Sequence, residues 1–291
     1  MTEKFICFDI GGTKIFKSVV EIDFSRRKFE FLDSKTIENP IDAEKIEKIV
    51  TDYCQQNQTK FETNKVAIST ARLIDPVNLK IFQVDNIYGV EEFSFKFLKE
   101  IGFQVVMEND GEAFVLGEYY FDGNEDKQGL LTLTLGTGIG GGFINSEGQV
   151  LRGKDNSTTE FSHIKMSING KWERWEDISA GRGIEKMYLE KTGKTKKTKE
   201  IFAEVESSEE ARVVIEKAQE YFSYGIANLI NIFNPEKIVF GGSLSSQKIF
   251  IEKAVEISQI SIFNQRAIPE WSISELKEEM NVLGVCALYY V

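Results

Sequence analysis

A short apolar run that ends in a turn rich in glycine and threonine occurs twice in this chain, and this repeat restricts the possible folds most. The first copy spans Phe5–Lys14 (FICFDIGGTK) and the second spans Leu130–Gly142 (LLTLTLGTGIGGG). Four to six apolar residues that stop at glycines predict strands followed by tight turns. The same strand–turn–strand unit therefore occurs twice, and the polar segment 121–126 between the copies predicts a domain boundary.

The first turn has the composition of an anion-binding loop. Adjacent Gly11 and Gly12 permit positive φ and a close approach of the backbone to a ligand, while Thr13 and Lys14 add a hydroxyl and an ammonium group. Asp9 would repel a phosphate unless a cation such as Mg²⁺ lies between them, so this carboxylate indicates a metal-bound nucleotide. Taken alone, the turn also fits a hairpin in which the glycines serve geometry only.

The second turn strengthens the nucleotide interpretation. Residues 136–142 contain five glycines, which is more than a hairpin needs. A glycine loop that faces its copy across a cleft holds an extended triphosphate from both sides, which neither loop does alone. A third glycine turn, Gly241–Gly242, follows the predicted strand Lys237–Phe240.

The composition excludes several classes of protein. A net charge of −11 and an acidic isoelectric point argue against nucleic acid as a partner. The chain has no apolar run of about eighteen residues and begins almost directly with a strand, so we expect no membrane span or signal peptide and a cytoplasmic location. Three distant cysteines build neither a disulfide framework nor a metal knuckle. We interpret the lysine-rich segment 191–199 as a solvated loop.

Periodicity predicts the elements between these motifs. Segment 41–56 has helical spacing with Asp42 as its N-cap, and Ser207–Glu210 opens a long helix that ends at Asn234–Pro235. The expected strands are 15–20, 29–31, 65–69 and 104–107, and the apolar segment 281–290 is expected to be a packing helix. Strands that alternate with helices predict the α/β class.

Polar residues stand at the predicted strand ends. Asn109 and Asp110 lie where a strand ends and a helix begins, which is where α/β proteins present catalytic side chains, although Asp110 also fits a simple N-cap. His163 is the only histidine and follows Glu160 by three residues, so the two side chains can converge. A surface or core histidine is the alternative. Trp172 and Trp175 suit either a core edge or sugar stacking.

The chain resembles the ROK (repressor, open reading frame, kinase) sugar kinases of the actin-like ATPase superfamily. The resemblance rests on six segments that occur in the same order: FDIGGTK, MENDGEA, LTLGTGIGGG, EFSH, WEDISAG and KIVFGGSLS. The likeness runs from Phe5 to about Leu288. It implies an α/β fold in which two ribonuclease-H-like domains enclose a cleft. The implied domains are residues 1–120, to which helix 281–291 returns, and residues 121–280.

The resemblance also implies an ATP- and Mg²⁺-dependent kinase that phosphorylates the 6-hydroxyl of a hexose or N-acetylhexosamine, with Asp110 as general base. The implied substrate contacts are Asn86, Asn109, Asp110, Glu160, His163 and Glu176. The implied nucleotide and metal contacts are Asp9, which reaches Mg²⁺ through water, and Gly11, Gly12, Thr13, Lys14, Gly136, Thr137, Gly138, Gly241 and Gly242.

Two departures from the family pattern bear on the substrate. The family's zinc-binding cysteines are replaced by Ser167, Asn169 and Arg174, so we expect no zinc site, with His163 as a hydrogen-bonding residue only. Packing by the two tryptophans is our hypothesis for what replaces the metal. The Pro-Gly pair usual after the strand at Ser69 reads Thr70-Ala71, which puts the sugar specificity in question.

The cysteine-free segment is most similar to the N-acetylmannosamine kinase branch, which makes N-acetylmannosamine the expected substrate. Glucokinase or another hexose kinase of the family is the alternative. A non-catalytic sugar sensor is the alternative of another class, and a repressor would require a helix-turn-helix segment before the first strand. Members of the family are usually dimeric, so the resemblance implies a homodimer.

Overall fold

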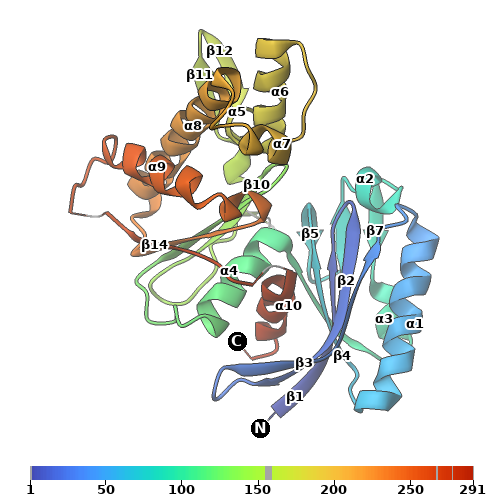
Figure 1. Cartoon of the computed structure of the whole chain (residues 1–291). Helices are drawn as coiled ribbons and strands as arrows, with labels where there is room; N and C mark the ends of the chain where they lie inside the picture. Colours follow the sequence, from blue (N-terminus) through green and yellow to red (C-terminus); the bar gives the residue numbers. More distant parts are fainter. Residues whose placement is uncertain (1, 155–158, 267, 277, 291) are drawn as a thin grey trace. The chain divides into compact units, whose positions relative to one another are not determined.

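The computed structural model describes residues 2–154, 159–266, 268–276 and 278–290. They form two compact units (Figure 1). The first comprises Met1–Asp126, Gly142–Thr159 and Leu276–Val291, and the second comprises Lys127–Gly141 and Glu160–Glu275. Residues 142–154 and 159, which the sequence-based boundaries place in the second domain, thus belong to the first unit. Residues 1, 155–158, 267, 277 and 291 of the predicted domain ranges lie outside the described residues.

The first unit is built on a five-stranded sheet with the order β3-β2-β1-β4-β8. β1 pairs antiparallel with β2 and parallel with β4, and β4 pairs parallel with β8. The strands are β1 (Thr2–Ile10), β2 (Lys14–Asp23), β3 (Lys28–Glu38), β4 (Lys65–Thr70) and β8 (Gln104–Asn109). All five predicted strands of this unit are present, and the predicted α/β class is confirmed.

Both faces of β1 are covered, which explains its unbroken apolar run. Ile6 and Phe8 pack into the core beneath α1 (Ala43–Phe61), whereas Phe5 and Cys7 pack into the core beneath α10 (Glu278–Ala287). A strand buried on both faces has no polar alternation. The sheet thereby holds its central strand, and the loop that follows it, in a fixed position.

Two helices lie side by side on the α10 face of this sheet (Figure 1). They are α10 and α4 (Asp110–Phe121). A Cβ atom at Gly284 would lie 1.8 Å from the carbonyl oxygen of Ala113, so only glycine permits this approach. α10 therefore fixes the helix that carries Asp110. α10 begins three residues before the predicted packing helix and ends four residues before residue 291, the end of the predicted range.

The remaining elements of the first unit are short. A three-stranded antiparallel sheet contains β5 (Leu73–Asp75), β6 (Lys80–Phe82) and β7 (Glu92–Ser94), and the short helices are α2 (Asp85–Tyr88) and α3 (Lys96–Glu100). Asp42 caps α1 as predicted, because its carboxylate accepts a hydrogen bond of 3.0 Å from the Lys45 amide.

The second unit contains the sheet β10-β9-β13-β14 and the antiparallel hairpin β11-β12. Its strands are β9 (Leu130–Leu135), β10 (Ile139–Ile144), β11 (Lys165–Ile168), β12 (Lys171–Arg174), β13 (Lys237–Gly241) and β14 (Glu270–Ile273), with β10 crossing the boundary between the units. The helices are α5 (Trp175–Ser179), α6 (Gly181–Thr192), α7 (Thr198–Ala203), α8 (Glu209–Phe233) and α9 (Lys248–Gln259). Ser208 caps α8 by accepting a hydrogen bond from the Ala211 amide.

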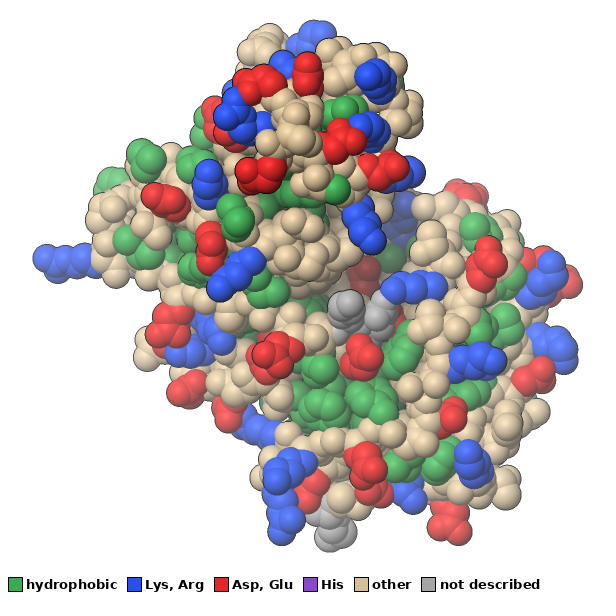
Figure 2. All heavy atoms as spheres, in the orientation of Figure 1, with side chains coloured by type: hydrophobic (Ala, Val, Ile, Leu, Met, Phe, Trp, Pro, Cys, Tyr) green, Lys and Arg blue, Asp and Glu red, His purple; other side chains and the backbone are tan. Residues whose placement is uncertain are grey.

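The surface carries charges of both signs. Among the described residues on the face drawn in Figure 2, lysine and arginine side chains are interspersed with aspartate and glutamate side chains. Within the described part of the chain, no helix combines the length and apolar composition that crossing a bilayer requires.

Candidate active site

The first loop follows β1 and is held by backbone and side-chain hydrogen bonds. The Gly11 amide donates to the Lys14 carbonyl at 3.0 Å, which closes the turn. The side-chain amide of Asn39 donates to the Gly11 carbonyl at 2.6 Å, and the Asn39 backbone amide donates to the Thr13 carbonyl at 3.0 Å. Asn39 is buried, while Thr13 and Lys14 are exposed. The backbone of the loop is thus fixed by hydrogen bonds, while its Thr13 and Lys14 side chains are exposed to solvent.

Asp9 lies at the end of β1 in a setting that suits a cation. Its Oδ1 accepts hydrogen bonds from the Ser69 hydroxyl at 2.6 Å and from the Asn281 side-chain amide at 3.3 Å. The pKa of Asp9 is raised from 3.8 to about 6, chiefly by burial and in part by the nearby Asp110 charge, while the hydrogen bonds from Ser69 and Asn281 and the charge of Lys14 oppose this rise. A desolvated carboxylate beside a second carboxylate is a hard oxygen donor set, so these residues fit Mg²⁺.

The end of β8 places Asn109 and Asp110 at the start of α4. Asn109 is the N-cap, since its Oδ1 accepts a hydrogen bond from the Gly111 amide at 2.9 Å, and Asp110 is the first helical residue. The Asn109 side-chain amide also donates to the carbonyl of Arg72 at 2.9 Å. Asn109 therefore performs the capping that the sequence also allowed for Asp110.

A buried charge cluster supports this strand end. Arg152 makes ion pairs with Glu108 and Glu112, both of which are buried. Glu108 also accepts a hydrogen bond of 2.9 Å from the Asn109 amide. Buried carboxylates are tolerated when they are paired, so Arg152 stabilises the segment that presents Asp110. This role of Arg152 was not predicted, because Arg152 is about forty residues from its partners along the chain.

Asn86 lies in α2, close to the first loop. A Cβ atom at Gly12 would lie 3.6 Å from the Asn86 carbonyl, and the Asn86 side chain accepts a hydrogen bond of 3.4 Å from Arg72. The first unit therefore brings together the predicted residues Asp9, Gly11, Gly12, Thr13, Lys14, Asn86, Asn109 and Asp110.

The second loop is held by the start of α6. The amides of Gly181 and Arg182 donate to the carbonyls of Gly136 and Thr137, both at 3.0 Å. A Cβ atom at Gly138 would lie 2.4 Å from Oε2 of Glu176. The loop thus lies directly against Glu176, another predicted site residue, and it contains no charged side chain.

A hollow of about 510 Å³ opens beside this second loop. Gly242 precedes the segment Ser243–Gln247 at its wall, with φ of 83°, and its Cβ would lie 2.3 Å from the Leu135 carbonyl, so this position requires glycine. The hollow is lined by Gly136, Thr137, Gly181, Arg182, Glu185, Lys197, Thr198, Lys199, Phe202, Ser243, Leu244, Ser246 and Gln247. Lys197 and Lys199 were expected in a solvated loop, yet they line this hollow. The three cations in this lining, Arg182, Lys197 and Lys199, fit the phosphates of a nucleotide.

Arg174 connects the residues around His163. Its guanidinium donates to Asp177 at 2.7 and 3.1 Å, lies 3.4 Å from Glu176, and lies 3.5 Å from Nε2 of His163. Nε2 of His163 and Oε1 of Glu176 are 4.0 Å apart. A cation thus lies beside His163 at a position where the family's zinc-bearing pattern has a cysteine ligand. Glu160 immediately precedes the 3₁₀ turn Phe161–His163.

The hypothesis that both tryptophans replace the metal is wrong for one of them. Trp175 is fully buried, stacks on Phe222 with ring centroids 5.4 Å apart, and donates to the Tyr221 carbonyl at 3.2 Å. Trp172 is 71% exposed, because it lies on the outer side of the β11-β12 hairpin. Among the described residues, no group of three or more histidine, cysteine, aspartate or glutamate side chains is placed to hold a metal.

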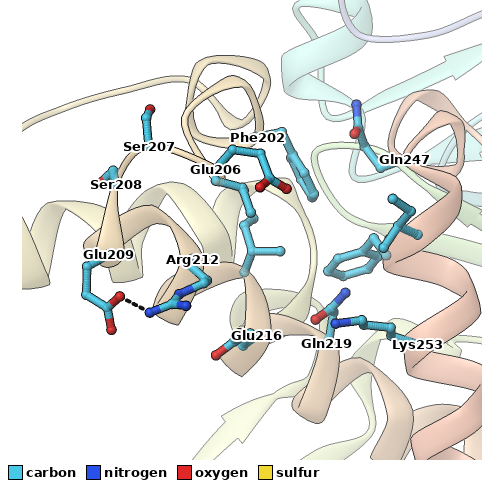
Figure 3. Close-up of a pocket in the computed structure, with 14 residues that line it drawn as sticks. Phe202, Glu206, Ser207, Ser208, Glu209, Arg212, Glu216, Gln219, Gln247 and Lys253 are labelled. Atoms are coloured by element: carbon cyan, nitrogen blue, oxygen red, sulfur yellow. Dashed lines mark hydrogen bonds and ion pairs between the residues drawn. The ribbon is translucent and has the colours of Figure 1, made fainter.

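A second hollow of about 560 Å³ lies between α7, α8 and α9 (Figure 3). It shares Phe202 and Gln247 with the hollow beside the second loop. Glu206, Glu209 and Glu216 give its rim an acidic character, which Arg212 and Lys253 offset in part. The sequence-predicted site residues are absent from its described lining.

The chain is similar to known sugar kinases in both sequence and fold. The model of the ROK family matches residues 5–290. A glucokinase of Streptomyces coelicolor is 26% identical over 82% of this chain and 81% of its own length. An N-acetyl-D-glucosamine kinase of Vibrio vulnificus is 26% identical over 84% and 86%. The solved structure of Lmo2764 from Listeria monocytogenes, a proposed N-acetylmannosamine kinase, is 25% identical, covers 99% of both chains and gives a TM-score of 0.84.

Proposed function

The chain belongs to the ROK family, and from this we propose that it is an ATP-dependent sugar kinase that phosphorylates the 6-hydroxyl of a hexose or N-acetylhexosamine. One observation supports the proposal above the others: Asp9 near the end of β1 and Asp110 directly after β8 stand on either side of β4 in the sheet of the first unit, close enough for the Asp110 charge to raise the pKa of Asp9. The Asp9 carboxylate suits a metal-bound phosphate, and the Asp110 carboxylate suits the hydroxyl of the sugar.

Asp110 is the proposed general base. Its place at the start of α4 leaves the carboxylate half-buried, and the Asn109 cap keeps the first helical turn in place. Phosphoryl transfer passes through a largely dissociative transition state, so the hydroxyl proton moves late and positioning contributes most of the rate. Asn86 and Asn109 in the first unit, and Glu160, His163 and Glu176 in the second, are the proposed sugar contacts.

Asp9 is the proposed residue for holding Mg²⁺, through water, and the metal when bound neutralises phosphate charge. Lys14 and the amides of Gly11 and Gly12 are proposed to contact the phosphates from the first unit. Gly136, Thr137 and Gly138 do so from the second, while Gly241 and Gly242 lie beside the nucleoside. The hollow with Arg182, Lys197 and Lys199 supports this assignment.

N-acetylmannosamine is the proposed substrate, and glucose is the alternative. The cysteine-free segment around Arg174 and the likeness to Lmo2764 support the first choice, and the Streptomyces glucokinase supports the second. We also propose a cytoplasmic homodimer, from the habit of the family.

A coupled assay of ADP release over a panel of hexoses and N-acetylhexosamines tests the proposal. We expect turnover that requires Mg²⁺ and is fastest with N-acetylmannosamine. If turnover is fastest with glucose, the proposed substrate is wrong but the proposed reaction is retained. Ligand binding in a thermal-shift assay, without ADP release on any sugar, would instead support a non-catalytic sensor.

A further inference from the structure

Arg72 has the most unusual backbone of the described non-glycine residues. It follows β4, where the chain leaves the sheet, and its φ is +86°. The other seven described non-glycine residues with positive φ lie between 46° and 58°, in the ordinary left-handed region. A residue with a Cβ atom is strained at such a φ, and strain of this kind is concentrated at functional sites.

Arg72 is held between the two amides that we assign to the sugar. Its carbonyl accepts the hydrogen bond from Asn109, at 2.9 Å, and its guanidinium donates to Oδ1 of Asn86, at 3.4 Å. Backbone and side chain are thus both attached to the proposed substrate pocket of the first unit. Arg72 stands one residue after the Thr70-Ala71 pair that already distinguished this chain from the family pattern.

Among the residues that the structure describes, no carboxylate neutralises the charge of Arg72. Within the described part of the chain, its guanidinium has no aspartate or glutamate oxygen within ion-pair distance, and its side chain is exposed. The charges that chiefly shift the pKa of Asp9 are those of Asp110 and Lys14. Arg72 therefore directs its charge toward the Asn86 end of the pocket and not toward the metal-binding carboxylate.

We propose that Arg72 selects a sugar that carries a carboxylate. The inference rests on the kinase function proposed above and changes its substrate class to an acidic sugar, with N-acetylmannosamine remaining the preferred neutral sugar. A guanidinium binds a carboxylate through two parallel hydrogen bonds, which an ammonium or amide does not reproduce. A chain with a net charge of −11 repels an anionic substrate unless a local cation offsets that field. The substrate carboxylate takes no part in the reaction, which transfers the γ-phosphoryl group to the hydroxyl oxygen and the hydroxyl proton to Asp110.

Two matched pairs of sugars with a free 6-hydroxyl test the proposal. They are glucose with gluconate, and N-acetylglucosamine with its 3-O-lactyl ether. We expect kcat/KM to be at least tenfold higher for one acid than for its neutral partner. Arg72→Gln is expected to lower kcat/KM for that acid by roughly 10- to 100-fold, because it removes a charge-assisted hydrogen-bond pair. The neutral partner is expected to lose much less, so the preference disappears.

Two further variants serve as controls. Arg26→Gln removes an arginine that is exposed in the β2–β3 turn, and we expect it to keep the preference of the wild type. Arg72→Gly relieves the backbone strain, so its melting temperature is expected to equal or exceed that of the wild type while the preference for the acid is lost. This result would separate loss of recognition from loss of folding.

Higher kcat/KM for both neutral sugars, or an equal loss for acid and neutral sugar in Arg72→Gln, would overturn the inference. Absence of turnover on every sugar would instead reject the kinase function. In that case, calorimetric titration with gluconate and the lactyl ether tests whether Arg72 binds the carboxylate. Binding that weakens in Arg72→Gln but not in Arg26→Gln supports the inference, and equal or absent binding rejects it.

Discussion

The two glycine loops have similar sequences but different surroundings. The first loop stands beside Asp9 and Lys14 and is fixed by Asn39, a residue that follows β3. The second loop has no charged side chain and is fixed by the first amides of α6, with the 510 Å³ hollow beside it. The difference suggests a division of labour, in which the first unit supplies the reacting groups and the second supplies most of the nucleotide binding.

The largest effect is expected from Asp110, the proposed base of the first unit. Asp110→Asn keeps the shape of the side chain but removes proton acceptance, which typically contributes 10²- to 10⁴-fold. We expect kcat to fall by that range while sugar binding, measured by calorimetry, stays within a few-fold of the wild type. Retention of most of the rate would remove Asp110 from this role.

In the second unit, Gly242→Ala is expected to act on the nucleotide. The added Cβ meets the Leu135 carbonyl at 2.3 Å and the residue has φ of 83°, so the segment Ser243–Ser246 must shift. We expect KM for ATP to rise roughly tenfold, equivalent to about 1.4 kcal/mol, with a smaller change in kcat. A change confined to kcat would contradict the assignment of this hollow to the nucleotide. Circular dichroism of the variant checks that the fold is retained.

Asp9 is expected to destabilise the ligand-free protein at neutral pH. Its pKa is about 6 in the fold against 3.8 in the unfolded chain, so the carboxyl is harmless below pH 4 and destabilises the fold as pH rises through 6. Asp9→Asn should therefore raise the free energy of unfolding by about 2 kcal/mol at pH 8, with allowance for partial solvation, and by almost nothing at pH 4.

Denaturant titrations of both proteins without Mg²⁺ measure this difference. A gain that is equal at pH 4 and pH 8 would mean that a cause other than ionisation operates. The same variant should lose Mg²⁺-dependent turnover, so stability and activity change in opposite directions.

A smaller effect is expected from Arg174, the cation among His163, Glu176 and Asp177. Arg174→Ala removes charge-assisted hydrogen bonds worth about 1 kcal/mol in a half-exposed setting, so KM for the sugar should rise about fivefold with little change in kcat. Arg174→Lys should recover part of the loss. An unchanged KM in Arg174→Ala would show that the guanidinium does not orient these residues.

Local patterns predicted the parts of the fold that local chemistry determines. The buried run of β1, the Asp42 cap and the glycine turns follow from neighbouring residues, and each is present. The long helix also begins within the predicted segment Ser207–Glu210, with Ser208 as its cap. The candidate nucleotide loops were visible for the same reason, because glycine is required where the backbone approaches another group.

The sequence did not reveal the residues whose roles depend on distant partners. Asn39 meets Gly11 across 28 residues, Arg72 meets Asn109 across 37, and Asn281 meets Asp9 across 272. No spacing rule connects such positions. The exposure of Trp172 was missed for a related reason, since the hairpin that turns it outward depends on Asn169 and Gly170, both with positive φ.

The two matched threonines, Thr13 in the first loop and Thr137 in the second, test the division of labour most directly. Thr13→Val and Thr137→Val each remove one hydroxyl with little change in volume, and steady-state kinetics with varied ATP gives kcat and KM for both variants. We predict that Thr13→Val lowers mainly kcat and that Thr137→Val raises mainly KM for ATP. The same parameter changing to the same extent in both variants would contradict the account.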